Sequence, residues 1–159
     1  MARDDRLSQG ADREAGDGAV DVHPGDAGEE IGGIEVRPLI DDVAVPRSRI
    51  AAFLDGCDGI AAARRLTIGV VGHAGDGNMH PTICFDPTDP DLRERAFAAF
   101  DDILELGLGL GGTITGEHGV GRTKKAALPD QLGPDVMALS HRIKDALDPE
   151  GILNPGAVL

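Results

Sequence analysis

His73-Ala-Gly-Asp-Gly-Asn-Met-His80-Pro81 places two histidines seven positions apart around a glycine-rich turn sequence. On a straight strand, residues at that separation would point to opposite faces and lie roughly 23 Å apart, too far to share a ligand. Gly75 and Gly77 permit positive φ, and Asp-Gly is a strong reverse-turn signal. A chain that doubles back here can bring the two imidazoles toward one site. The simpler alternative is an ordinary hairpin turn with two surface histidines.

The segments around this motif have strand and helix patterns. Residues 66–71 and 81–85 are apolar and strand-like, and a further strand is expected within residues 34–45, before Pro46. Apolar residues at helical spacing predict helices over residues 47–65 and 91–106. This order predicts an α+β fold with a mostly antiparallel sheet and helices on one face, of ferredoxin-like type.

Beyond the second helix, glycines interrupt the chain and a short β-prone run, Thr113-Ile114-Thr115, follows. Residues 122–131 read as a connector. Pro134 is suited to the first turn of a last helix. An apolar stripe then continues at helical spacing through Val136, Leu139, Ile143 and Leu147. His141 falls off this stripe and is expected at the surface.

Composition divides the chain into two parts. Residues 1–33 are acidic and rich in glycine, with too few apolar residues to offset the entropy cost of ordering, so this segment is expected to be disordered. Residues 34–159 have the apolar content of one folded domain. The two cysteines, Cys57 and Cys84, make no disulfide framework and read as buried free thiols.

The net charge and the distribution of apolar residues disfavour several classes of partner and location. The formal net charge of −13 disfavours nucleic-acid binding and electrostatic docking to an anionic membrane. No apolar run approaches the roughly 20 residues of a membrane-spanning helix, and the N-terminus has no apolar core of a secretory signal. A cytoplasmic location is therefore expected.

A second polar motif is Gly116-Glu117-His118-Gly119. His73, His80 and Glu117 form a set of two imidazoles and one carboxylate, which leaves coordination positions open, as in catalytic zinc and related sites. His118 is then placed to act as a general base, because imidazole exchanges protons near neutral pH. Spacing alone leaves two alternatives open. Glu117 and His118 can be a solvated pair, and residues 73–78 can cradle a phosphate, although no Lys and no P-loop spacing accompany them.

Three motifs in order resemble one family. They are the histidine motif of residues 73–81, Gly116-Glu-His-Gly-Val-Gly121, and Asp148-Pro-Glu-Gly-Ile-Leu-Asn-Pro-Gly156. The chain from about Asp41 to Leu159 resembles the C-terminal cap domain of FAD-linked oxidases that act on 2-hydroxy acids. Asp42-Val-Ala-Val-Pro46 resembles the strand that precedes the first helix of this half in the family. Such enzymes include D-lactate dehydrogenases, the D-subunit of glycolate oxidase and D-2-hydroxyglutarate dehydrogenases. Residues 1–33 show no resemblance.

The resemblance implies a role for each matching residue. His73, His80 and Glu117 match ligands of a divalent ion, zinc or manganese, which orients a small 2-hydroxy acid. His118 matches the histidine that takes the hydroxyl proton while a hydride passes to the flavin. Asn78 and Asn154 match asparagines near the flavin or substrate.

Two departures from the family pattern shape the expected function. No counterpart of the FAD-binding domain, or of the first half of the cap domain, is found before Asp41, and Ala157 replaces the lysine that usually follows Pro-Gly. The leading hypothesis is a fragment or split subunit of an FAD-dependent 2-hydroxy-acid dehydrogenase, whose FAD is held mainly by a separate FAD-binding polypeptide. The alternative is a non-catalytic metal-binding or subunit-contact module that uses the same residues.

Overall fold

The computed structural model describes residues 29–31 and 34–159. The expected disordered segment, residues 1–33, lies outside this range except for Glu29–Ile31. These three residues form strand β1, which pairs with the start of β2. The division of the chain at residues 33 and 34 otherwise stays a prediction.

An antiparallel sheet forms the body of the molecule, with β5 (Asn78–Phe85) at its centre. β4 (Thr67–His73) pairs along one side of β5. β2 (Ile34–Ile40) and β3 (Val43–Ala44) pair in succession along the other side. The predicted strands are thus present, and β5 begins three residues earlier than Pro81, so that it includes His80.

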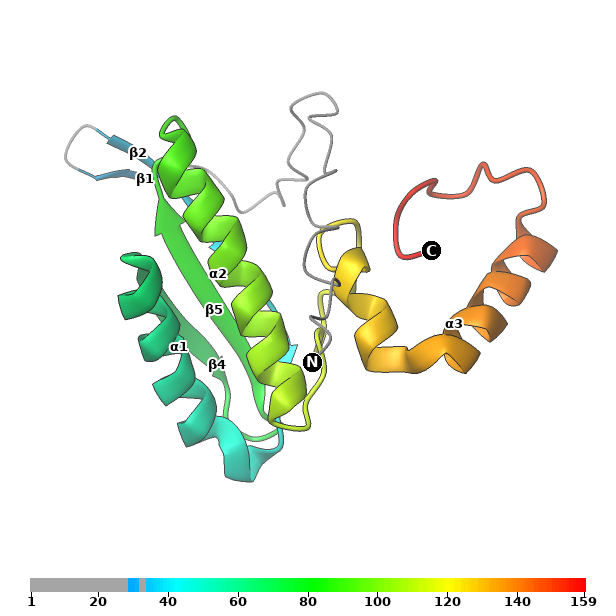
Figure 1. The fold of residues 1–159 in the computed structure, drawn as a ribbon, viewed down its shortest axis with the longest axis horizontal. Helices are drawn as coiled ribbons and strands as arrows, with labels where there is room; N and C mark the ends of the chain where they lie inside the picture. The colour runs from blue at the N-terminus through cyan, green and yellow to red at the C-terminus, as the bar shows by residue number, and fades with distance from the viewer. Residues whose placement is uncertain (1–28, 32–33) are drawn as a thin grey trace, which may run out of the picture.

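The sheet is covered on one face by two helices, as the sequence predicts (Figure 1). A 3-10 turn (Arg47–Arg49) leads into α1 (Ile50–Arg64), and α2 (Pro90–Gly109) follows β5. Asp89 caps α2 by accepting hydrogen bonds from the N–H groups of Asp91 and Leu92. The core between sheet and helices is fully buried and includes Val43, Phe53, Ile83, Phe100 and Ile103.

The β-prone run after α2 completes the expected ferredoxin-like arrangement. Thr113 forms an antiparallel bridge with Ala44, and each residue donates its N–H to the carbonyl of the other. In the sheet β5 therefore lies between β4 on one side and β2 with β3 on the other. β1 pairs with β2, and the Thr113 segment pairs with β3. Because the bridge is antiparallel, the chain that follows Thr113, including Glu117 and His118, runs back beside Asp42, just before the start of β3.

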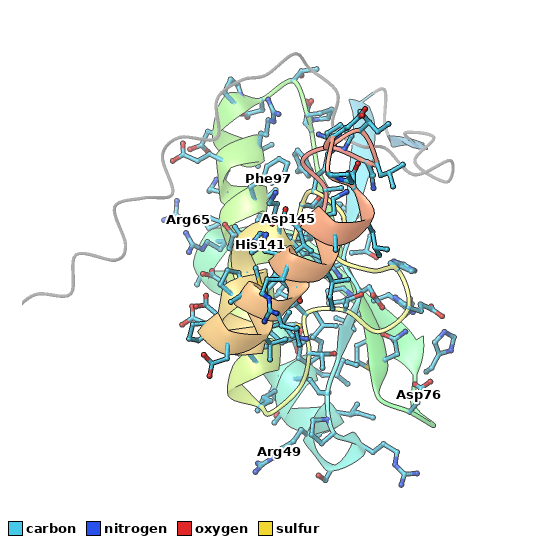
Figure 2. All side chains as sticks on the ribbon, turned by 90° about the vertical axis from the view of Figure 1, so that its right-hand side faces the viewer. Arg49, Arg65, Asp76, Phe97, His141 and Asp145 are labelled. Atoms are coloured by element: carbon cyan, nitrogen blue, oxygen red, sulfur yellow. The ribbon has the colours of Figure 1, made fainter. Side chains whose placement is uncertain are left out.

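The last helix differs from the sequence-based expectation. α3 (Leu128–Leu147) follows a 3-10 turn (Lys125–Ala127) and begins before Pro134, with a kink at Gly133, where φ is 74° and ψ is 168°. Residues 128–131, predicted as part of a connector, are therefore helical. α3 extends away from the layer formed by α1 and α2 (Figure 1). Its apolar stripe is exposed, at 45% for Val136, 51% for Leu139, 52% for Ile143 and 75% for Leu147. His141 is exposed, as expected (Figure 2).

Within the described part of the chain, no helix has both the length and the apolar composition needed to cross a membrane. The cytoplasmic location expected from the sequence stays a prediction. Both cysteines are free; Cys57 is buried, as expected, and Cys84 is only half-buried.

Candidate metal and proton-transfer site

The hairpin between β4 and β5 brings His73 and His80 together. His73 pairs with Asn78, and Val71 pairs with His80. Paired residues, and residues two apart on one strand, share a face of a sheet, so the two histidines are diagonal neighbours. Their ring centroids lie 5.4 Å apart. Because Met79 and Ile83 point into the core, the histidines lie on the sheet face opposite to α1 and α2.

The turn between the histidines depends on Gly77. The N–H of Gly77 donates to the carbonyl of His73 at 2.9 Å, and Gly77 has a φ of 85°, which side-chain-bearing residues rarely adopt. A Cβ on this residue would also collide with the carbonyl oxygen of Val45. Asp76, at the tip of the hairpin (Figure 2), accepts a hydrogen bond from the N–H of Asn78 at 3.0 Å. The sequence therefore correctly predicts that the chain doubles back at this motif.

Glu117 lies beside both histidines. Its Oε1 is 3.2 Å from Nε2 of His80 and 3.7 Å from Nε2 of His73, and one ligand atom from each residue lies within 4.8 Å of the others. The side chain of His80 is 11% exposed, whereas those of His73 and Glu117 are 60% and 53% exposed. This donor set of two nitrogens and one oxygen suits zinc or manganese and faces solvent on one side.

His118 stacks on this group from the neighbouring loop. Its ring lies 5.1 Å from that of His80, with an interplanar angle of 19°. Its Nε2 is 3.8 Å from Oε1 of Glu117, and its side chain is 41% exposed. An imidazole that borders the donor set and remains open to solvent can exchange a proton with a molecule bound there. The reading of Glu117 and His118 as an isolated solvated pair does not describe this arrangement.

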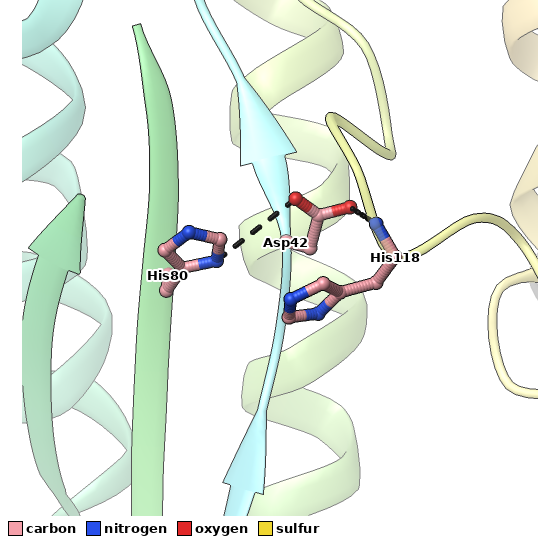
Figure 3. A group of neighbouring side chains, drawn as sticks. All are labelled: Asp42, His80 and His118. Carbon is pink, nitrogen blue, oxygen red and sulfur yellow. Dashed lines mark hydrogen bonds and ion pairs between the residues drawn. The ribbon is translucent and has the colours of Figure 1, made fainter. Parts of the chain in front are cut away.

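Asp42 organises the loop that carries Glu117 and His118 (Figure 3). Its buried carboxylate accepts hydrogen bonds from the Thr115 hydroxyl at 2.7 Å and from the N–H groups of Gly116, Glu117 and His118 at 2.8 to 3.1 Å. Burial alone would raise the pKa of Asp42, but these donors outweigh it and hold that pKa well below its usual value. Asp42 is therefore a carboxylate throughout the neutral range.

A buried ion pair between Lys124 and Asp41 anchors the backbone at Asp41 and Asp42. Lys124 donates to the backbone carbonyl of Asp42 at 2.6 Å, and its Nζ lies 2.8 Å from Oδ1 of Asp41. Burial raises the pKa of Asp41, and Lys124 opposes that rise. The N–H of Asp41 donates to the carbonyl of Pro81 at 2.8 Å, which ties this segment to β5 next to His80.

Sequence reasoning did not single out Asp42 as a site residue. The available signal was a pair of adjacent aspartates at the start of an apolar strand. Such carboxylates are buried only with strong partners, but a sequence does not show which partners they have.

The two asparagines expected near a cofactor differ in position. Asn78 is buried, its Oδ1 has no hydrogen-bond partner, and it lines an open pocket together with Ala44, Asp76, Gly116 and Glu117. Gly116 allows this close approach, since a Cβ on it would force the Asn78 amide to shift. Asn154 is exposed on the C-terminal tail and does not line the pocket. That tail lies against the chain after His118, because Arg122 donates to the carbonyl of Pro155 at 2.9 Å.

A second set of side chains overlaps the first. Asp42, His80 and His118 also offer three ligand atoms within 4.8 Å of one another. The Asp42 carboxylate is already shared among a hydroxyl and three backbone donors, so a metal ligated by Asp42 would compete with the hydrogen bonds that shape the loop. The set of His73, His80 and Glu117 carries no such conflict among the hydrogen bonds described above.

Comparison with known proteins identifies a matching family model, described as FAD linked oxidases, C-terminal domain, over residues 14–158. The match begins inside the segment of residues 1–33, so the expectation of no resemblance there is wrong. Curated relatives include the glycolate oxidase subunit GlcD of Bacillus subtilis, 45% identical over 118 residues that make up 74% of this chain and 25% of that protein.

Further relatives are D-lactate dehydrogenases. The mitochondrial D-lactate dehydrogenase [cytochrome] of Arabidopsis thaliana is 39% identical over 76% of this chain and 21% of that protein. A probable mitochondrial D-lactate dehydrogenase of Danio rerio is 36% identical over 74% of this chain and 24% of that protein. The chain thus spans about a quarter of the length of the curated relatives it matches.

Proposed function

This chain belongs to the family of FAD-linked oxidases, as a C-terminal domain, and from that premise we propose that it supplies the metal, substrate and proton-transfer side of an FAD-dependent oxidation of a small 2-hydroxy acid. The relatives named for glycolate oxidase and D-lactate dehydrogenase support this class of substrate. The observation that carries the proposal is the convergence of Nε2 of His73, Nε2 of His80 and Oε1 of Glu117.

Each residue has a defined part in the proposed reaction. His73, His80 and Glu117 would hold a zinc or manganese ion, which would leave positions for the carboxylate and hydroxyl of the substrate. His118 takes the hydroxyl proton, so that the substrate loses one proton and one hydride and becomes a 2-oxo acid. The cation, when bound, would make the hydroxyl more acidic, and the flavin would accept the hydride.

Asn78 is proposed to contact the flavin or the substrate. Its buried Oδ1 without a partner borders the pocket beside Glu117, so a hydrogen-bond donor of a bound molecule would satisfy it. The corresponding proposal for Asn154 receives less support, because this residue lies on the exposed tail.

The flavin is proposed to be held mainly by a domain outside these 159 residues, for which a separate FAD-binding polypeptide is one source. A partner domain would also bury the exposed apolar stripe of α3, which no described element covers. On this reading residues 34–159 are the C-terminal half of a cap domain, and the chain acts as a fragment or split subunit.

The proposal can be tested by complementation. The Bacillus subtilis relative, truncated to remove the 118 residues that match this chain, supplies the remaining part. The mixture is assayed for dye reduction with D-lactate, glycolate and D-2-hydroxyglutarate after the metal content of each component has been measured. We expect activity with wild-type chain and at most a trace with Glu117→Gln.

The complementation has a second informative outcome. Stoichiometric metal in this chain, without activity in any mixture or with any of the three acids, would contradict the catalytic proposal. It would favour the non-catalytic metal-binding or subunit-contact module.

A further inference from the structure

Asp42 lies directly across the sheet from His80. Ile40 pairs with Thr82, and Val43 pairs with Met79. The same antiparallel register, continued across the two residues between these pairs, places Asp41 opposite Pro81 and Asp42 opposite His80. The ladder is interrupted here because Pro81 has no N–H to return the bond that its carbonyl accepts from Asp41. Paired residues share a face, so the Asp42 carboxylate and the His80 imidazole point to the same side.

The facing atoms of this pair are Oδ1 of Asp42 and Nδ1 of His80, 3.9 Å apart (Figure 3). Nδ1 of His80 is buried and has no hydrogen-bond partner, and Asp42 is fully buried. The other ring nitrogen of His80, Nε2, faces Glu117 at 3.2 Å. A neutral imidazole carries one proton, so a proton on Nδ1 leaves the lone pair of Nε2 free for a cation.

The same carboxylate also shapes the second motif. Its Oδ2 accepts from Thr115, Gly116 and His118, while Glu117 donates to both oxygens at 3.1 Å. Three successive backbone N–H groups thus donate to one side chain. These hydrogen bonds fix the backbone of the loop and therefore the direction in which the side chains of Glu117 and His118 project.

We propose that Asp42 is a positioning residue that links the two halves of the site. Its negative charge, 3.9 Å from Nδ1, favours the His80 tautomer whose Nε2 is free, and its hydrogen bonds hold the loop of residues 115–118 so that Glu117 lies beside that nitrogen. The metal-related part of this proposal rests on the proposed function. The effects on the His80 tautomer and on the loop do not, because they concern the metal-free chain.

Asp42→Asn is the diagnostic substitution. The amide has nearly the same shape, and its oxygen can still accept from the loop if its NH₂ group faces His80. That NH₂ group would donate to Nδ1 and shift the proton of His80 to Nε2, the wrong nitrogen for the cation. Asp41→Asn is the matched control, since it changes the adjacent buried carboxylate, which bonds Lys124 and contacts neither His80 nor the loop through its side chain.

The experiment uses the full chain and three readouts. Long-range ¹H–¹⁵N spectra of the histidine-labelled, metal-free protein report the His80 tautomer, amide hydrogen exchange reports residues 116–118, and titration with Zn²⁺ alone reports affinity. Because the Glu117 carboxylate, 3.2 Å from Nε2, attracts the same proton, we expect the Nδ1–H fraction of His80 to be larger in wild type and Asp41→Asn than in Asp42→Asn. Zn²⁺ affinity should fall about 10–100-fold in Asp42→Asn only, the range typical of outer-shell partners.

Several results would overturn the inference. An unchanged His80 tautomer together with unchanged Zn²⁺ affinity in a folded Asp42→Asn variant would do so, and so would an equal loss of affinity in Asp41→Asn. If wild type binds no Zn²⁺, the proposed function fails, while the tautomer and exchange data still decide the role of Asp42.

If Asp42→Asn does not fold, Thr115→Val replaces it. This variant removes one donor to Asp42 and should speed amide exchange at residues 116–118, whereas unchanged exchange would count against the proposal.

Discussion

Nε2 of His80 lies 3.2 Å from Oε1 of Glu117, although the two residues come from different motifs and different elements. Strand pairing places His80, and the hydrogen bonds to Asp42 place Glu117. The site is thus a product of the fold rather than of one loop, and the following predictions separate its parts.

Replacing His118 by Asn should separate proton transfer from metal binding. His118 is not among the three proposed ligands, so Zn²⁺ affinity should stay close to that of wild type. In the complemented enzyme, the rate of flavin reduction should fall by about 10²–10⁴, the usual contribution of a general base. Rapid-mixing absorbance of the flavin measures this rate. A large loss of Zn²⁺ affinity in the variant would instead make His118 a ligand.

The core between sheet and helices should carry most of the stability. Ile103→Ala removes a fully buried side chain and should lower the free energy of unfolding by about 2–5 kcal/mol. Leu139→Ala, on the exposed stripe of α3, is the control and should change it by less than about 0.5 kcal/mol. Urea unfolding followed by circular dichroism measures both. Equal losses would mean that the stripe of α3 is covered in solution.

The two thiols should react at very different rates. Burial, with the nearby carboxylates of Asp58 and Asp41, raises the pKa of Cys57 to about 12, so this thiol stays protonated and inaccessible at pH 8. Cys84 is only half-buried. A thiol reagent followed by mass spectrometry should modify Cys84 first, and Cys57 only in denaturant. Rapid modification of Cys57 in the native protein would contradict the buried core around α1.

The chain by itself should bind flavin weakly or not at all, because the proposal assigns most of the flavin site to another domain. Equilibrium dialysis against FAD, with flavin absorbance as the readout, tests this expectation. Serum albumin in the same cell is a control for non-specific uptake. Stoichiometric, tightly held FAD in the purified chain would refute the assignment.

The sequence predicts the sheet and its two covering helices because these are decided locally. The apolar runs on either side of the histidine motif, the Asp-Gly turn and the helical spacing of residues 47–65 and 91–106 each involve neighbours in the chain. The pairing of Asp42 with His80 involves distant segments, and no local pattern encodes it. The meeting of His80 with Glu117 was therefore a hypothesis until the register was known.

α3 shows the corresponding limit for helices. The helical spacing of Val136, Leu139 and Ile143 correctly indicates an amphipathic helix. The spacing of apolar residues does not identify the element that packs against the apolar face. The early start of α3 at Leu128 was missed, because Gly133 and Pro134 mark a kink inside the helix rather than its beginning.

The central claim is that His73, His80 and Glu117 form a divalent-metal site, and calorimetric titration of the metal-free chain with Zn²⁺ and Mn²⁺ tests it most directly. His73→Ala and Glu117→Gln alter exposed ligands and should fold normally, while His141→Ala removes an exposed histidine far from the site in sequence. We predict one ion per chain for wild type and His141→Ala. Affinity should fall by more than about 100-fold in the two ligand variants, since even outer-shell changes cost 10–100-fold. Unchanged affinity in Glu117→Gln and His73→Ala, or no binding by wild type, would contradict the claim.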